Sequence, residues 1–221
     1  LSIGVERMTK RKTIVRKLNA IETMGSLTLI ATDKTGTLTT NQMRVKKIWV
    51  DEKEYNITSP PHTTNHPFQK ILLNASLNST ASLVIKVGNG EMDGVGDTTE
   101  GAWLLLAKDL GINYEEERKK WPIEEEIPFS AVTKRMSVKV KELNKPSSCY
   151  IFSKGAPESI LEICRFVQIG KEIKPLTPPK RKEIEQEFQK FAQQGLRLIA
   201  FSYKKPDHKK LEEDQIFLGF V

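Results

Sequence analysis

Apolar and polar residues recur along this chain in patterns that predict a mixture of strands and helices. Residues 26–32 form a short apolar, β-branched run that predicts a buried strand, and alternation within residues 44–57 predicts a hairpin that turns at residues 51–53. Residues 1–25 are predicted to form a basic and partly helical arm. Helical spacing predicts helices at residues 67–81, 97–110, 157–164 and 178–194. Further apolar runs predict strands at residues 127–140, 149–153, 196–203 and 216–221.

The two ends of the sequence resemble parts of one further domain. The apolar run at residues 216–221 extends to the last residue, and the predicted strand at residues 26–32 ends abruptly in a polar turn. We therefore expect residues 42–214 to be an insertion, with residues 1–41 and 215–221 as flanks that belong to another domain. The mixture of elements predicts an α/β (α+β) fold.

The composition is typical of a soluble globular protein, with 221 residues, of which 38% are hydrophobic and 29% charged. No apolar run approaches the roughly 18 residues that cross a bilayer, and the first residues lack the apolar segment of a signal peptide. The two cysteines, Cys149 and Cys164, have no metal-ligand spacing. We expect two small buried thiols in a reducing compartment, with a bridge between them as the alternative.

The formal net charge of +7 raises the question of a nucleic-acid partner. No aromatic residues interleave with the basic cluster near the start of the chain, as a surface for stacking bases would require. The cluster consists of Arg7, Lys10, Arg11, Lys12, Arg16 and Lys17. We therefore expect no nucleic-acid partner. Two interpretations of the cluster stay open: a solvated arm, or a segment just inside a membrane.

Asp33 stands where the predicted strand meets a polar turn, DKTGTLT at residues 33–39. Ligands gather beyond the carboxyl ends of strands in open α/β sheets, so this carboxylate is placed to react. A carboxylate can attack a phosphoryl group and form an acyl phosphate if positive charge, hydrogen-bond donors and magnesium surround the transferred oxygens. Lys34, the Thr35 hydroxyl and the backbone near Gly36 can supply part of that environment. In the alternative, Asp33 only caps a turn.

The DKTGTLT string resembles the phosphorylation signature of P-type ATPases, which belong to the haloacid-dehalogenase-like superfamily. The resemblance implies that Asp33 accepts the phosphate, with Lys34 and Thr35 beside it, and that Asp33 and Thr35 are ligands of Mg²⁺. Related phosphatases have a second aspartate two positions after the nucleophile, where this chain has Thr35. Because that aspartate acts as acid and base, its absence should slow attack by water, which favours a pump over a phosphatase.

Further strings, in the same order, resemble the successive signatures of the P-type nucleotide-binding domain, and calcium-pump-like type II pumps are the nearest group. The strings are GDTTE at residues 96–100, Phe129 with KRM at 134–136, KGAPE at 154–158 and GLR at 195–197. The resemblance covers nearly the whole chain. It implies a nucleotide-binding domain with a mainly antiparallel sheet flanked by helices, inserted into a partial haloacid-dehalogenase-like phosphorylation domain.

The same resemblance implies an ATP site. It places Glu100 near the adenine amino group and Phe129 against the adenine ring. Lys154 lies at the back of the pocket, where Gly155 lets the backbone approach the base. Lys134 borders the nucleotide, and Arg197 reaches the phosphates. The full set is Glu100, Phe129, Lys134, Met136, Lys154, Gly155 and Arg197.

Several of these residues also have structural alternatives. Glu100 stands at capping-box spacing from Asp97, so its carboxylate could instead return a hydrogen bond to a helix start. Phe129 could belong to a core, and Arg197 could be a solvated strand end. Arg135 is expected to be a solvated strand residue.

Two positions depart from the family pattern. Thr98 replaces the usual proline before the Thr-Glu pair, which loosens that loop. Ala131 and Val132 stand where charged residues are common, so contacts on the phosphate side are expected to be fewer.

The resemblance implies a full-length membrane protein that couples ATP hydrolysis to cation transport, with this part at the cytoplasmic face. The transmembrane helices that would bind the cation are not in the sequence, so this part alone is expected to bind ATP without efficient turnover. Two alternative functions are a soluble haloacid-dehalogenase-like phosphatase built around Asp33 and a protein-interaction module that uses the basic arm.

Overall fold

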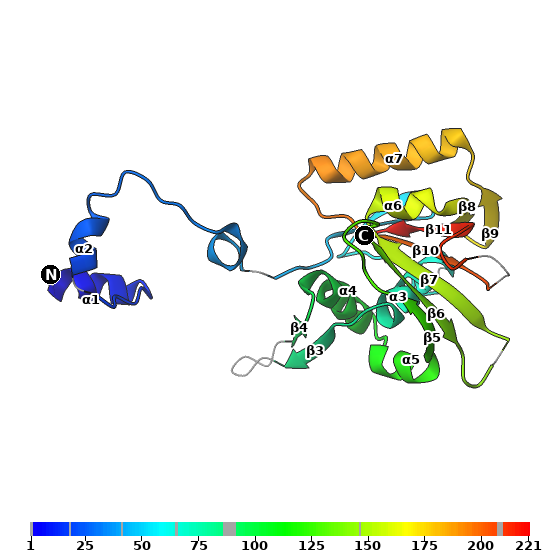
Figure 1. Ribbon diagram of the computed structural model, residues 1–221, viewed down its shortest axis with the longest axis horizontal. Helices are drawn as coiled ribbons and strands as arrows, with labels where there is room; N and C mark the ends of the chain where they lie inside the picture. The colour runs from blue at the N-terminus through cyan, green and yellow to red at the C-terminus, as the bar shows by residue number, and fades with distance from the viewer. Residues whose placement is uncertain are drawn as a thin grey trace. The chain divides into compact units, whose positions relative to one another are not determined.

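The computed structural model describes residues 2–17, 19–40, 42–64, 66–85, 92–145, 147–206 and 210–221. The chain divides into two compact units, Leu1–Asn41 and Gln42–Val221. Figure 1 shows both, coloured from the N-terminus to the C-terminus.

The described residues of the first unit form three short helical segments. They are α1 (Ser2–Lys10), α2 (Asn19–Met24) and the π-helical turn η1 (Lys34–Leu38). The prediction of a partly helical arm is confirmed. The predicted buried strand at residues 26–32 is wrong, because this segment has no strand structure and Leu29 and Ile30 are 80% and 76% exposed. A strand needs a neighbour to take up its backbone hydrogen bonds, and the described residues of this unit form no other strand.

The second unit is built on a mainly antiparallel sheet, so the predicted fold class is confirmed. Its described residues form a nine-stranded sheet with the path β2-β1-β11-β10-β7-β6-β5, and β8 pairs with β11 and β9. Only the β8–β11 pair among these is parallel. The strands are β1 (Lys47–Val50), β2 (Lys53–Asn56), β5 (Ile123–Ile127), β6 (Arg135–Lys141), β7 (Cys149–Gly155), β8 (Cys164–Ile169), β9 (Glu172–Pro175), β10 (Ala200–Lys204) and β11 (Gln215–Phe220).

Helices cover both faces of this sheet (Figure 1). One face packs against α3, α4 and α5, and the other against α6 and α7. A separate two-stranded hairpin, β3 and β4, packs beside α4. These elements are α3 (His66–Leu77), α4 (Thr98–Asp109), α5 (Tyr114–Lys120), α6 (Pro157–Glu162), α7 (Pro178–Gln193), β3 (Ser82–Ile85) and β4 (Met92–Val95).

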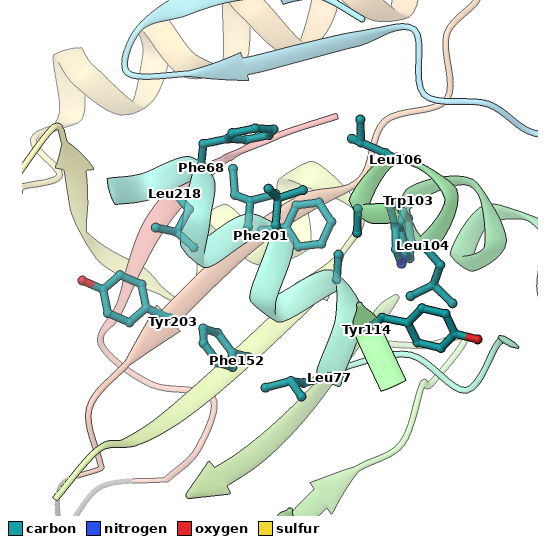
Figure 2. Packing of buried hydrophobic residues seen from close by; sticks show 14 of the residues in the cluster. Phe68, Leu77, Trp103, Leu104, Leu106, Tyr114, Phe152, Phe201, Tyr203 and Leu218 are labelled. Atoms are coloured by element: carbon teal, nitrogen blue, oxygen red, sulfur yellow. The ribbon is translucent and has the colours of Figure 1, made fainter. Parts of the chain in front are cut away.

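Alternation along the strands gives the sheet two apolar cores. In β10, Phe201 and Tyr203 belong to the core under α3, whereas Ala200 belongs to the core under α6 and α7. In β11, Leu218 and Phe217 divide in the same way. Figure 2 shows the first core, in which side chains from α3, α4, β7, β10 and β11 meet. Because β11 pairs with β1, β8 and β10, it lies inside this sheet.

The predicted hairpin within residues 44–57 is confirmed as β1 and β2. Its turn residues Asp51 and Glu52 both have positive φ, 54° and 60°, which is the conformation of a type I′ turn. The predicted helices are confirmed as α3, α4, α6 and α7, with ends that differ by a few residues.

The strand predicted over residues 127–140 is only partly present, because residues 128–134 are not a strand in the structure. β5 ends at Ile127 and β6 begins at Arg135, and the two pair antiparallel. Pro128 cannot donate to a sheet ladder, and Lys134 has a left-handed φ of 52°, so neither residue continues a strand. The intervening residues 128–134 form a connecting loop that carries Phe129 and Lys134.

Candidate functional site

A buried ion pair joins the sheet to a helix in the second unit. The ammonium of Lys154, on β7, donates to Oε1 of Glu100, on α4, and the two side chains are only 7% and 12% exposed. The Lys154 ammonium also lies 5.1 Å from the ring centroid of Trp103, one helical turn beyond Glu100. Charges are buried only when paired and hydrogen-bonded, so this arrangement indicates a functional or architectural role.

The second carboxylate oxygen of Glu100 organises the turn that follows α3. Oε2 accepts hydrogen bonds from the Ser79 hydroxyl (3.1 Å), the Thr80 amide (2.8 Å) and hydroxyl (3.0 Å), and the Ala81 amide (3.1 Å). Burial alone would raise the pKa of Glu100, but the Lys154 ammonium and the Thr80 hydrogen bonds outweigh it and lower the pKa below its ordinary value. Glu100 is therefore held as a carboxylate.

The start of α4 has its own cap. The Asp97 carboxylate accepts from the amides of Thr99 (2.8 Å) and Glu100 (3.0 Å). The side chain of Glu100 is directed to the residue 79–81 turn and to Lys154, and the hydrogen bonds described for it include no return to the helix start.

Arg118, on α5, fixes the same turn from its other side. Its guanidinium donates to the carbonyls of Ser76 (2.9 Å), Ser79 (2.7 Å) and Ala81 (3.0 Å). Burial lowers the pKa of Arg118, although the neighbouring acidic groups partly oppose this shift. Burial likewise lowers the pKa of Lys154, and Glu100 opposes it. The turn is thus held by one carboxylate and one guanidinium. No local pattern in the sequence indicates this contribution of Arg118.

Three of the residues expected to bind the nucleotide, Met136, Lys154 and Gly155, lie on the paired strands β6 and β7. Met136 lies opposite Lys154 in the register, and Arg135 lies opposite Gly155. Met136 is buried in the first core. A Cβ built on Gly155 would lie 2.3 Å from the Lys134 carbonyl oxygen and 2.7 Å from Arg135 Cα, so only glycine allows the strands to approach this closely.

The residue 128–134 loop carries two of the three exposed members of the expected set. Phe129 is 64% exposed, so its aromatic ring is not part of a core. Lys134 is also exposed, and its backbone carbonyl accepts from the Ala156 amide at 2.9 Å. This bond places the end of the loop directly beside the KGAPE segment.

Arg135 is not the solvated residue that the sequence predicted. Its side chain is 14% exposed and forms an ion pair with Glu212, with Nε 2.8 Å from Oε2. It also donates to the Ser159 hydroxyl at 3.1 Å. Alternation along a strand predicts exposure when only one face is buried, and both faces of β6 are covered near this end.

Arg197 lies apart from these residues in the chain, in the segment that leads from α7 to β10, and it is exposed. The residues on either side of it help to line a cavity of about 400 Å³. The lining residues are Pro157, Glu158, Glu185, Phe188, Gln189, Ala192, Leu196 and Leu198. The lining shares Pro157 and Glu158 with the KGAPE segment but does not include Phe129, Lys134 or Lys154.

Asp33 belongs to the first unit, where it is exposed and immediately precedes η1. The following turn closes on itself, because the Thr39 amide donates to the Lys34 carbonyl (3.2 Å) and Gly36 has a φ of 77°. Lys34 is exposed, and the side chain of Thr35 lies outside what the structure describes. Within the described part of the chain, no group of three His, Cys, Asp or Glu side chains is arranged to hold a metal ion.

None of the helices in the described ranges has the length and apolar character that spanning a bilayer requires. The fold of the second unit is that of an α/β nucleotide-binding domain. The family model of the P-type ATPase cytoplasmic domain N matches residues 67–221, and the chain belongs to the P-type ATPase family.

Three relatives are similar to almost the entire chain. A calcium-transporting ATPase of Bacillus subtilis is 32% identical over 99% of this chain and 26% of its own length. A cation-transporting ATPase of Synechocystis is 32% identical over the whole chain and 26% of its own length, and a probable plasma membrane-type calcium-transporting ATPase of rice is 34% identical over 94% of the chain and 20% of its own. This chain thus spans about a quarter of the length of such relatives and is calcium-pump-like in sequence.

Proposed function

We propose that this chain is the ATP-binding part of a P-type ATPase that couples ATP hydrolysis, through an aspartyl phosphate at Asp33, to the transport of a cation across a membrane. The observation that carries the proposal is the buried lysine on β7. Lys154 is paired with Glu100, and the next residue, Gly155, lies so close to the backbone of β6 that a side chain would not fit there. In this proposal the chain lies at the cytoplasmic face of the full-length protein, whose membrane helices bind the cation.

The adenine site is proposed to lie between Lys154 and the residue 128–134 loop. The exposed ring of Phe129 offers a face on which a base can stack. Glu100 Oε2 already accepts four hydrogen bonds, whereas Oε1 is described with one, from Lys154. Since each carboxylate oxygen has two lone pairs, Oε1 is the atom that can accept from the adenine amino group.

Positive charge for the phosphates is proposed to come from Lys134 and Arg197. Both side chains are exposed to solvent, so both charged groups are accessible to a ligand. A guanidinium suits bidentate contact with phosphate oxygens, and an ammonium acts as a point charge. Met136 supports this site by packing in the core, and Gly155 supports it by allowing the close approach of β6 to β7.

The chemical step is proposed to occur at Asp33. A carboxylate oxygen of Asp33 attacks the γ-phosphorus of ATP, the bond from that phosphorus to the β–γ bridging oxygen breaks, and ADP leaves. Lys34 stabilises the charge on the transferred oxygens. Thr35 cannot act as the base that would activate water, so the acyl phosphate persists.

The residues around Asp33 fit magnesium. Mg²⁺ prefers oxygen ligands and is commonly bound by one or two carboxylates together with waters and substrate phosphates. The exposed Asp33 carboxylate is such a ligand, and Thr35 is the second residue that we assign to the ion. When bound, Mg²⁺ would neutralise charge on the phosphates.

Nucleotide titration of this chain tests the proposal. Addition of ATP should shift the amide resonances of residues near Phe129 and Lys154, and Phe129→Ala should weaken binding about 10-fold. Val132→Ala is the matched control, since Val132 lies on the same loop and is 91% exposed. Unchanged resonances at millimolar ATP would refute the assignment of the site. Release of inorganic phosphate by this chain alone should be slow, and rapid hydrolysis of simple phosphate esters would contradict the assignment as a pump.

A further inference from the structure

The residue 128–134 loop is held mainly by polar contacts. All side chains from Phe129 to Lys134 are exposed except that of Ser130, which is half-buried. The loop has one internal turn, in which the Lys134 amide donates to the Ser130 carbonyl at 2.6 Å, and Lys134 takes a left-handed φ of 52° that only Gly adopts freely. Apolar burial therefore does not fix this loop, and other contacts must.

Those contacts converge on Arg135, the first residue of β6. Its Nε pairs with Glu212 Oε2 at 2.8 Å, and its Nη1 donates to the Ser159 hydroxyl on α6 at 3.1 Å. The Ser159 hydroxyl in turn donates to the carbonyl of Thr133, inside the loop. Arg135, Glu212 and Ser159 are thus a polar clamp that fastens the end of the loop to α6.

Glu212 connects this clamp to the interior of the sheet. Its Oε1 accepts from the Ser137 hydroxyl at 2.8 Å, and Ser137 and Ser153 hydroxyls lie 2.7 Å apart. Gln215 Nε2 donates to Ser153 Oγ at 2.7 Å. Ser137, Ser153 and Gln215 are fully buried. The clamp is therefore anchored to β6, β7 and β11 by a hydrogen-bonded network. Glu212, which lies 77 positions from Arg135 along the chain, sets where Arg135 lies.

We propose that Arg135 and Glu212 are positioning residues for nucleotide binding: they hold the residue 128–134 loop in the conformation that presents Phe129 and Lys134 to ATP. The inference rests on the proposed function, because it assumes that those two side chains contact the nucleotide. Arg135 and Glu212 need not touch ATP themselves. Their effect is on the fraction of molecules in which the loop is competent, and the apparent Kd rises in inverse proportion to that fraction.

The test measures ATP affinity of the chain by isothermal titration calorimetry in Arg135→Met and Glu212→Gln variants. If removal of the clamp leaves the loop in its ATP-binding conformation in about one molecule in ten, the Kd for ATP rises about 10-fold. Lys139→Met is the matched control: Lys139 lies on the same strand and forms an ion pair with Glu124 at 3.2 Å, away from the loop. It should leave the Kd unchanged.

A second readout separates positioning from a general loss of stability. Amide order parameters of residues 130–134 in the nucleotide-free protein should fall in both clamp variants, while those of β7 should stay at wild-type values. Affinity is compared at a temperature at which circular dichroism shows each variant folded. Where Arg135→Met does not fold, Glu212→Gln and Ser159→Ala carry the test, because each changes one partner of Arg135 and keeps the guanidinium.

The outcomes distinguish the two proposals. If Phe129→Ala weakens ATP binding and the folded clamp variants bind ATP like the wild type, the positioning role is refuted and the proposed function stands. If the clamp variants bind weakly but their loop order parameters do not change, the positioning role is also refuted. If Phe129→Ala itself has no effect, the proposed adenine site fails, and the positioning role fails with it.

Discussion

The ammonium of Lys154 and the carboxylate of Glu100 form a buried ion pair that ties strand β7 to helix α4. Because the same carboxylate binds the amides of Thr80 and Ala81, one charged group joins three segments that are far apart in the sequence. The pair therefore acts on the fold as well as on the proposed ATP site, and the two effects can be measured separately.

Removal of one partner should be costly. Lys154→Met leaves the Glu100 carboxylate buried without its counter-charge, and we expect a loss of about 3 kcal/mol in the free energy of unfolding, measured by urea denaturation. The exposed pair of Lys120 and Glu117, 2.9 Å apart, is the control, and Lys120→Met should cost far less because solvent screens this pair. Equal losses in the two variants would show that the buried pair has no special role.

The lowered pKa of Glu100 should make the stability of the chain depend on pH. Its pKa in the folded chain is below the ordinary value of 4.5, so the folded state favours the carboxylate. The stability that this shift contributes is fully present above pH 4.5 and is lost as the pH falls through the lower pKa of the folded state. The difference in unfolding free energy between the wild type and Glu100→Gln should therefore be constant near neutral pH and shrink in acid. A difference that grows on acidification would contradict the assigned direction.

Gly155 should not tolerate a side chain. The added Cβ of Gly155→Ala would press on backbone atoms of Lys134 and Arg135, which cannot move without shifting β6. We expect a loss of about 2–3 kcal/mol in unfolding free energy, together with weaker ATP binding. Gly111→Ala is the comparison, because Gly111 has a positive φ of 80° but open space around it, and its cost should be about 1 kcal/mol of backbone strain. A smaller loss at Gly155 than at Gly111 would mean that the strands separate easily.

Local patterns predicted most of the second unit from the sequence. The β1–β2 hairpin and the amphipathic helices α3 and α7 follow from periodicities that depend on neighbours in the chain. The KGAPE and GLR strings were likewise found from sequence alone, and the family to which the chain belongs confirms the class of protein that they implied. Features that depend on long-range contacts were harder to predict.

Arg135 illustrates the limit. Its partner Glu212 lies 77 positions away, so no local pattern indicates that the guanidinium is covered. Arg118 is a similar case, since it binds carbonyls of a turn about 40 positions earlier. The strand predicted at residues 26–32 failed for the opposite reason: its local pattern is strand-like, but a strand also needs a partner.

The two cysteines should differ sharply in reactivity. Both are free thiols, so the bridge considered from the sequence is absent between these two described residues. Cys164, on β8, is buried in the core under α6 and α7, and burial raises the pKa of its thiol to about 12. Cys149 is only half-buried at the start of β7; burial raises its pKa too, against the opposing charges of Lys139 and Lys141.

A thiol reagent such as 5,5′-dithiobis(2-nitrobenzoic acid) at pH 8 should therefore label Cys149 in the folded chain, and Cys164 only in urea. In Cys149→Ser, the labelling rate of Cys164 then reports how often the α6–α7 side of the sheet opens. If this rate follows global unfolding as urea increases, both faces of the sheet unfold together. Rapid labelling of Cys164 in the absence of urea would show instead that α7 detaches while the first core stays intact, because only the second core covers this thiol.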